Sequence, residues 1–494
     1  MSSPSVPGAG SVKSPLLHFN NVGYNNNLNA ENSQPCGVAS RLKSALLSLV
    51  GSNSNVLVIS GDCERSAHES TESTRSDSLF STSLQVCIAI TLSGFGNVGA
   101  GLILDVVQHW SVFKTINELI ILVPSLLGLK GNLEMTMAAR LSTQANLGNM
   151  KDFKSTLYLA KGNMALIQCQ ATVVAFLATI FAIATNSISK GSIDMQNILI
   201  LLASSLLTAN VACFLLGACM VTIIVLSNRF EIDPDNVATP LAASIGDVTT
   251  LALLASFAQI IQNHAPPGTT SIPSCIIILI LFALLPFWIY TAWKNEHTIN
   301  VITSGWLPII LAMLISSMGG FILNDATSRF ERLAMFQPVI NGVGGNLVAV
   351  QASRLSTYLH RQGKPGHLPL SFGCLISPCR AFIGSNINVS TARVLLLMSI
   401  PAHILYLVVF RLIKGVGGFE MTTFFMTFYL IFAVLQVSML LYFAHNLVIL
   451  LWRNGTDPDN FSIPILTALG DFLGTAFLLV VFILLSTVSD INAM

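Results

Sequence analysis

DPDNVATPLAASIGD, at residues 233–247, recurs far downstream as DPDNFSIPILTALGD at residues 457–471. Both copies follow the pattern D-P-D-N-x3-P-x5-G-D, and each places its last aspartate, Asp247 or Asp471, in a long apolar run. An unpaired charge in the middle of a bilayer costs roughly 3 kcal/mol or more. Because this cost is incurred twice at the same spacing, the repeat suggests that the two aspartates serve one shared cation site.

The composition is that of a membrane protein. Hydrophobic residues make up 53% of the chain and charged residues only 10%, which excludes a soluble globular protein. A bilayer core of about 30 Å requires roughly 20 apolar residues per helix, and the chain has many such runs. The lipid bilayer is therefore an expected partner. The net charge of +1 gives no indication of nucleic-acid binding, and we expect none.

The apolar runs predict an all-α polytopic membrane protein with about eleven transmembrane helices. Their expected limits are 84–105, 116–141, 162–186, 197–227, 238–262, 273–293, 305–325, 334–357, 391–411, 422–451 and 462–488. Residues 1–80 are rich in Ser, Asn, Gly and Glu and have no sustained apolar period. This composition predicts a disordered tail, which we expect to be cytosolic.

A second duplicated block divides the chain into two repeats. PSLLGLKGNLEMTMAARLST at 124–143 matches PVINGVGGNLVAVQASRLST at 338–357 in its Pro, Gly-x2-Gly-Asn-Leu and Arg-Leu-Ser-Thr positions. Each repeat, at 84–262 and 305–490, would hold five spans, with 273–293 as a connector helix. One extra crossing between two five-span units gives them the same orientation, so we expect parallel repeats about an axis along the membrane normal.

The basic residues predict the orientation in the membrane. With the N-terminus in the cytosol, about seventeen Lys and Arg residues lie inside and about six outside. The C-terminus would then be extracellular and both D-P-D-N turns cytosolic. We therefore expect the sequons at Asn388, Asn454 and Asn460 to remain unglycosylated.

Proline positions suggest how deep the two aspartates lie. Pro240 and Pro464 suit the first turn of a helix, where the missing amide proton costs nothing. Counting seven residues onward would place Asp247 and Asp471 roughly 10 Å inside their helices. Such depth implies a wet cavity or a bound cation. The alternative is that each aspartate hydrogen-bonds a neighbouring helix.

The other acidic residues of the motif have a simpler interpretation. Asp233, Asp235, Asp457 and Asp459 precede or begin the helices, where a carboxylate caps free amides and meets the positive end of the helix dipole. Capping is the favoured reading. A regulatory cation site at a cytosolic pore mouth is the alternative, since four clustered carboxylates would attract divalent ions.

The glycine block predicts a second part of the cation site. Several glycines and a proline in one span suggest a bent or partly unwound helix that exposes carbonyl groups near Asn132 and Asn346. With Asp247 and Asp471 these form an all-oxygen set suited to magnesium. Close helix packing through glycine is the alternative interpretation.

The two glycine blocks differ at two charged positions. Lys130 and Glu134 of the first block become Gly344 and Val348 in the second, so the site cannot be fully symmetric. A lone lysine would repel a cation, and we expect it to pair with Glu134 one turn away.

At these residues the chain resembles the MgtE-type membrane domain, and GLKGNLEMTMAARLST, FQPVINGVGGNLVAVQASRLST and DPDNVATPLAASIGD resemble the eukaryotic magnesium transporters of solute carrier family 41. The resemblance covers about residues 84–490. It implies Mg²⁺ transport along a path between the two repeats, with Asp247 and Asp471 lining the pore. It also implies exchange for Na⁺, although no residue here identifies a sodium site and uncoupled, channel-like permeation stays open. No catalytic activity or cofactor is expected, and the expected location is the plasma membrane.

Two further expectations bear on the site. Magnesium dehydrates reluctantly, so we expect a wide site in which carboxylates contact the hydrated ion. Two membrane aspartates also suggest an intramembrane aspartyl protease. However, Ser244 and Ala468 stand where that signature has a glycine, and the chain has no Tyr-Asp pair. A receptor or scaffold without transport activity is a third possibility.

Overall fold

The structure is a computed structural model that describes residues 79–146, 149–150, 152–190, 194–229, 234–265, 271–368, 377–383, 387–414 and 421–487. All the described residues belong to one compact unit. The predicted tail at 1–80 therefore lies outside the described residues, apart from its last two positions.

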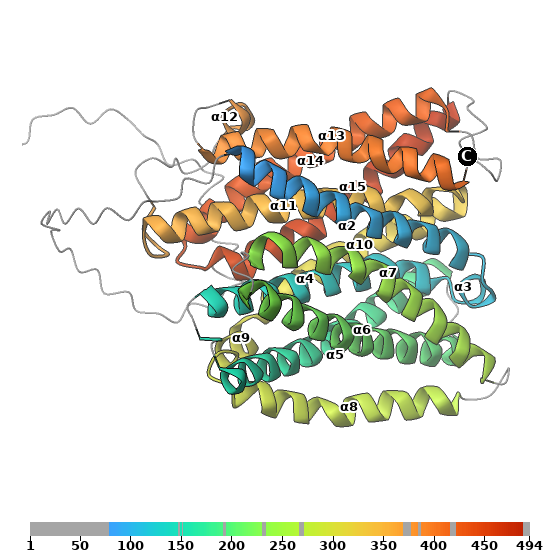
Figure 1. The fold of residues 1–494 in the computed structure, drawn as a ribbon. Helices are drawn as coiled ribbons and strands as arrows, with labels where there is room; N and C mark the ends of the chain where they lie inside the picture. The colour runs from blue at the N-terminus through green and yellow to red at the C-terminus, as the bar shows by residue number, and fades with distance from the viewer. Residues whose placement is uncertain are drawn as a thin grey trace, which may run out of the picture. The chain divides into compact units, whose positions relative to one another are not determined.

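The described part of the chain is helical and contains no strand. Eleven of its helices are long and apolar enough to span a bilayer, and they run alongside one another (Figure 1). These helices are α2 (Leu79–Val107), α4 (Glu118–Asn146), α5 (Phe153–Lys190), α6 (Met195–Arg229), α7 (Pro234–Asn263), α8 (Ile272–Trp293), α10 (Trp306–Arg329), α11 (Leu333–Gln362), α13 (Ile387–Lys414), α14 (Thr423–Arg453) and α15 (Pro458–Thr487). Three short helices lie between them: α3 (Ser111–Thr115), α9 (Ile299–Ser304) and α12 (Pro378–Phe382). The predicted fold class, an all-α polytopic membrane protein, is confirmed.

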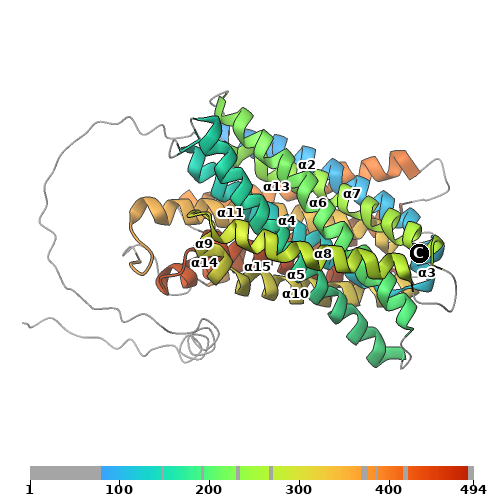
Figure 2. The same cartoon turned by 90° about the horizontal axis from the view of Figure 1, so that it is seen from below.

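The two helices that carry the glycine blocks lie at the centre. In the apolar windows of α4 and α11, 76% and 89% of the residues are buried, against only 6% for α8. The connector helix α8 packs on α5 and α6 at the edge of the bundle, and it crosses in front of the other helices in Figure 2. The small side chains of the glycine blocks suit a central position because they allow neighbouring backbones to approach closely.

The two repeats pack against each other by the same contacts. The first helix of each repeat lies on the second helix of the other, so α2 packs on α11 and α10 packs on α4. A Cβ atom on Gly101 of α2 would overlap the carbonyl oxygen of Met335, and a Cβ atom on Gly320 of α10 would overlap that of Ile121. Because Ile121 and Met335 are equivalent positions of the glycine-block helices, these reciprocal contacts indicate an approximate two-fold relation.

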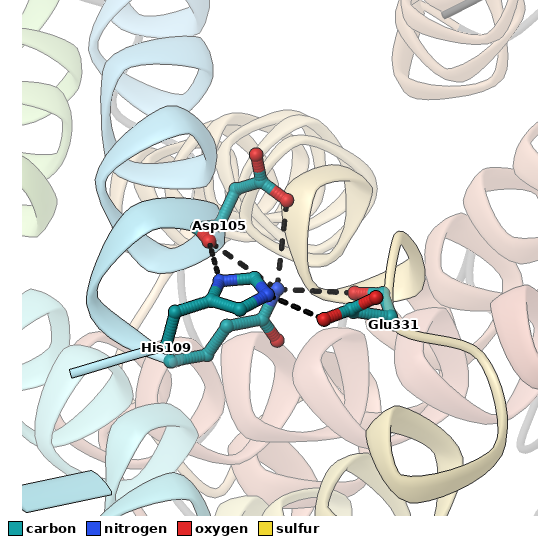
Figure 3. A network of polar contacts seen from close by, with 4 residues as sticks. Asp105, His109 and Glu331 are labelled. Carbon is teal, nitrogen blue, oxygen red and sulfur yellow. Dashed lines mark hydrogen bonds and ion pairs between the residues drawn. The ribbon is translucent and has the colours of Figure 1, made fainter. Parts of the chain in front are cut away.

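The repeats run in the same direction, as a polar network at one end of the bundle shows (Figure 3). His109, just after α2, contacts the Glu331 carboxylate in the turn after α10, and Gln108 Nε2 donates to the Glu331 carbonyl oxygen at 3.1 Å. His109 Nδ1 also lies 2.8 Å from the Asp105 carbonyl oxygen. Since α2 and α10 are equivalent helices and both end here, the predicted parallel arrangement is confirmed.

One predicted feature of the D-P-D-N motif is wrong. The helices begin at Pro234 and Pro458, so Pro464 lies inside α15 instead of starting it. The reason is visible at Asp457, whose carboxylate accepts a bond from the backbone amide of Asp459 at 3.1 Å and so caps the helix at the first proline. Asp471 therefore lies thirteen positions beyond the helix start, roughly 20 Å along the axis and not 10 Å.

The predicted unwinding of the glycine blocks is also wrong. Helices α4 and α11 continue through their glycines and through Pro124 and Pro338. Helical hydrogen bonding occupies the backbone carbonyl groups that we expected to be exposed. The alternative interpretation, close helix packing through glycine, is the one that the structure supports.

Candidate functional site

A cavity lies between the two glycine-block helices, and α7 and α15 contribute one aspartate each to its wall. Four pairs of equivalent positions line it: Pro124 and Pro338, Gly128 and Gly342, Gly131 and Gly345, and Asn132 and Asn346. The remaining lining residues are Leu127, Met135, Asp247, Gln337, Asn341, Thr467 and Asp471. The cavity therefore lies where the two repeats meet.

All four residues predicted as cation ligands reach this one cavity. Asp247 and Asp471 are partly buried, whereas Asn132 and Asn346 are buried with 2% and 6% exposure. They come from four helices spread over more than 300 residues of sequence. The motif spacing predicted the residue types, and the packing of the repeats brings them together.

Asp471 is held on several sides. Ser316 Oγ of α10 donates to Asp471 Oδ2 at 2.9 Å, so a hydroxyl fixes one carboxylate oxygen. Asn341 Nδ2 of α11 donates to the Asp471 carbonyl oxygen at 3.1 Å. Gln436 Nε2 of α14 donates to the carbonyl oxygen of Gly470 at 2.9 Å. A carboxylate fixed in this way needs little reorganisation when it meets a cation.

The two asparagines are anchored by hydroxyl groups of different helices. Thr467 Oγ1 of α15 donates to Asn132 Oδ1, and Asn346 Nδ2 donates to Ser93 Oγ of α2. Both bonds join the two repeats. Each amide is therefore oriented by the opposite half of the chain.

The cavity is small. Its volume is about 50 Å³, where one water molecule takes about 30 Å³ in the liquid. The wide site expected from the sequence is not found in this structure. The physical reason is the close approach of the central helices, since a Cβ atom on Gly128 would lie only 2.6 Å from Asp471 Oδ2.

Of the remaining acidic residues of the motifs, those that the structure describes do not line the cavity. Glu134 is fully buried in α4 but is not among the lining residues, and the Lys130 side chain lies outside what the structure describes. The predicted pairing of these two residues therefore stays a prediction. Asp233 and the side chain of Asp235 also lie outside the described part.

Asp457 and Asp459 form a separate cluster with His360. His360 Nε2 lies 3.2 Å from Asp457 Oδ1 and 3.8 Å from Asp459 Oδ2, and the three donor atoms lie within 4.8 Å of one another. These donor types bind divalent metals, but the cluster is partly exposed and begins roughly 20 Å along α15 from Asp471. Asp457 also accepts from Asn460 Nδ2 at 3.2 Å, which agrees with the capping interpretation.

Sequence reasoning missed four residues of the site: Ser316, Gln337, Asn341 and Thr467. A signal for two of them was present, because Gln337 and Asn341 replace Val123 and Leu127 of the first repeat. Polar substitutions inside an otherwise apolar helix point to a function. Ser316 and Thr467 carry no comparable signal, because hydroxyl residues are common in membrane helices.

Comparison with known families extends this description. The MgtE family model, a divalent cation transporter, matches residues 123–257 and again residues 337–481. The chain belongs to the MgtE family. Both matches run from a glycine-block helix to the helix that carries Asp247 or Asp471, and together they contain every residue that lines the cavity.

Curated relatives place this MgtE protein within solute carrier family 41. It is 46% identical to solute carrier family 41 member 2 of Xenopus laevis, over 87% of this chain and 76% of that protein. It is 48% identical to member 2 of Homo sapiens, over 82% and 71%, and 43% identical to member 3 of Rattus norvegicus, over 83% and 88%. These relatives are solute carriers. The MgtE protein is therefore a divalent cation transporter and not an enzyme, which rejects the protease and scaffold alternatives.

Proposed function

We propose that this protein carries Mg²⁺ across a membrane along the path between its two repeats, and that the cavity is the ion site on that path. The observation that supports this proposal is the convergence of Asp247 and Asp471, from equivalent helices, on one cavity. We take residues 84–262 and 305–490 as the repeats and 273–293 as the connector.

The chemistry of the wall supports a hard divalent cation as substrate. Carboxylate and amide oxygens face the cavity, and no His or Cys is among its lining residues. Mg²⁺ prefers such oxygen ligands and usually keeps part of its water shell. Two carboxylates offset the charge of one divalent ion, which lowers the cost of bringing it into a membrane protein.

Magnesium flux into proteoliposomes tests this proposal. We expect Asp247→Asn nearly to abolish flux and Asp471→Asn to damage it strongly, because each removes one charge that stabilises the ion. Asp325→Asn is a matched control, since Asp325 is a carboxylate of α10 that pairs with Arg329 and lies outside the cavity wall. Normal flux in both cavity variants would remove these residues from the path.

Coupling to sodium is part of the proposal and needs its own experiment. The resemblance to family 41 implies exchange of Mg²⁺ for Na⁺. We expect an opposing sodium gradient to accelerate Mg²⁺ flux in the same proteoliposomes. A rate that is independent of sodium on both sides favours uncoupled, channel-like permeation.

The orientation is inferred from the distribution of basic residues. We propose a plasma-membrane protein with its N-terminus in the cytosol and its C-terminus outside. The His360 cluster and Asn454 would then face the cytosol. Glycosylation of Asn454 in cells, seen as a shift in mobility that glycosidase reverses, would contradict this orientation.

A further inference from the structure

The cavity wall is chemically one-sided despite the approximate two-fold relation. On α11 the second repeat contributes Gln337 and Asn341, both buried and both lining the cavity. The equivalent positions on α4 are Val123 and Leu127, which are buried and apolar. Amide oxygens therefore stand on the side of Asp471.

Asn341 has a structural use for its nitrogen. Its Nδ2 donates to the Asp471 carbonyl oxygen at 3.1 Å and to Thr475 Oγ1 at 3.3 Å. A Cβ atom on Gly474 would overlap Asn341 Oδ1, so this oxygen lies against α15. Asn341 is therefore a positioning residue that holds α15 beside the cavity.

Gln337 Oε1 and Asn341 Oδ1 are both buried acceptors without a donor among the described residues, but Asn341 is tied to α15 through its nitrogen. Among the described residues, no donor reaches Gln337 Oε1, although the side chain is only 1% exposed. Native proteins satisfy most buried polar atoms, and each exception asks for an explanation, such as a role in binding. Gln337 Oε1 is such an exception, and it lies on the wall of a cavity that also has two carboxylates. An oxygen with a free lone pair in that position is suited to contact a cation.

The coordination chemistry of Mg²⁺ favours such a ligand. Mg²⁺ takes six oxygen ligands, and the cavity volume of about 50 Å³ is less than the roughly 180 Å³ that six waters fill at about 30 Å³ each. Oxygen atoms of the cavity wall can replace some of these waters around the ion. On the Asp471 side, Gln337 can supply a neutral oxygen that the first repeat cannot match at Val123.

We propose that Gln337 is a further cation-contacting residue, and that it forms with Asp471 a binding half-site that exists only in the second repeat. This inference rests on the proposed function of the cavity. Gln337 Oε1 contacts the ion or a water of its shell, while the first repeat has the apolar Leu127 on the wall at the position equivalent to Asn341 and no polar side chain at Val123. Gln337 should therefore influence the apparent affinity for Mg²⁺ more than the maximal rate.

The experiment measures the dependence of Mg²⁺ flux on Mg²⁺ concentration for the full chain in proteoliposomes. Gln337→Met keeps the length of the side chain and removes the oxygen. We expect it to raise the KM for Mg²⁺ at least fivefold, with less than a twofold change in maximal rate per reconstituted protein. Gln337→Glu retains an oxygen at that place and should leave KM at or below the wild-type value.

Gln170→Met is the matched control. Gln170 on α5 is also fully buried, both its amide atoms lack partners among the described residues, and it does not line the cavity. Its replacement should leave KM unchanged. Should Gln337→Met not be recovered folded, Gln337→Asn withdraws the oxygen by one methylene and should also raise KM.

The outcomes separate the two proposals. Absence of Mg²⁺ flux in the wild-type protein contradicts the proposed function itself. Wild-type flux with an unchanged KM in Gln337→Met, or in Gln337→Asn where that variant takes its place, overturns only the role of Gln337. An equal rise of KM in Gln170→Met and Gln337→Met also overturns it, because the effect would then belong to any buried amide.

Discussion

Gly128 of α4 lies directly against the carboxylate of Asp471 on α15. A Cβ atom on Gly128 would lie 2.6 Å from Asp471 Oδ2 and 2.8 Å from Ser316 Oγ. A side chain from the first repeat would therefore displace the acidic group of the second. This relation makes Gly128 a sensitive probe of the cavity.

We expect Gly128→Ala to reduce Mg²⁺ flux about tenfold, because the carboxylate must move away from its place beside Ser316. A misplacement of a binding group by about 1 Å is enough for a loss of this size or more. Gly363→Ala serves as the control, since a Cβ atom there, at the end of α11, meets nothing within 4 Å. Flux and recovered protein should be measured for both, and full activity of Gly128→Ala would contradict the prediction.

The hydroxyl of Ser316 should matter more than that of its neighbour. Ser316 donates to Asp471, whereas Ser317 pairs with Ser125 at 2.8 Å. A hydrogen bond to a charged group contributes about 1.5–3 kcal/mol, so Ser316→Ala should lower flux or affinity severalfold. Ser317→Ala should have little effect on the flux of Mg²⁺ or on its dependence on Mg²⁺ concentration. Equal effects of the two variants would show that the hydrogen bond from Ser316 to Asp471 does not contribute to transport.

The packing of the repeats should depend equally on two distant glycines. A methyl group on Gly101 or Gly320 would overlap a backbone carbonyl oxygen of the opposite repeat, and a backbone atom cannot move aside cheaply. We expect Gly101→Ala and Gly320→Ala each to destabilise the folded protein by about 1–3 kcal/mol. Thermal unfolding in detergent measures this effect. A large loss in one variant with none in the other would be evidence against the two-fold relation.

The role of Asp457 can be separated from that of a cation site. If Asp457 acts as a helix cap, Asp457→Ala should cost about 0.5–2 kcal/mol of stability, while Asp457→Ser should recover most of it because serine caps well. If Asp457 instead forms a cation site with His360 and Asp459, Asp457→Ser should weaken Mg²⁺ binding, because serine lacks the carboxylate charge. Thermal unfolding with and without Mg²⁺ distinguishes the two: a Mg²⁺-dependent stabilisation lost in Asp457→Ser and His360→Ala would favour the cation site.

The apolar runs and the duplicated motifs were enough to predict the helices and their grouping. Long apolar runs predict membrane helices because the bilayer sets their length, and ten of the eleven expected spans begin within six residues of an observed helix start. The exception is α5, which begins at Phe153 instead of 162, because its first turns are polar and extend beyond the apolar run. Two duplicated motifs in the same order also identified the repeats, and their invariant Asp and Asn positions identified four residues of the cavity wall.

The start of the helices in the D-P-D-N motif and the role of the glycines could not be predicted, because both depend on contacts in the folded protein. Two prolines in one motif each suit a helix start, and the hydrogen bond from the Asp459 amide to Asp457 selects the first of them. Glycines in a membrane helix are compatible with unwinding or with close packing, and only a neighbouring carbonyl or carboxylate distinguishes the two. That choice depends on atoms hundreds of residues away in the chain, as it does for Gly128 and Asp471, and no local pattern records it.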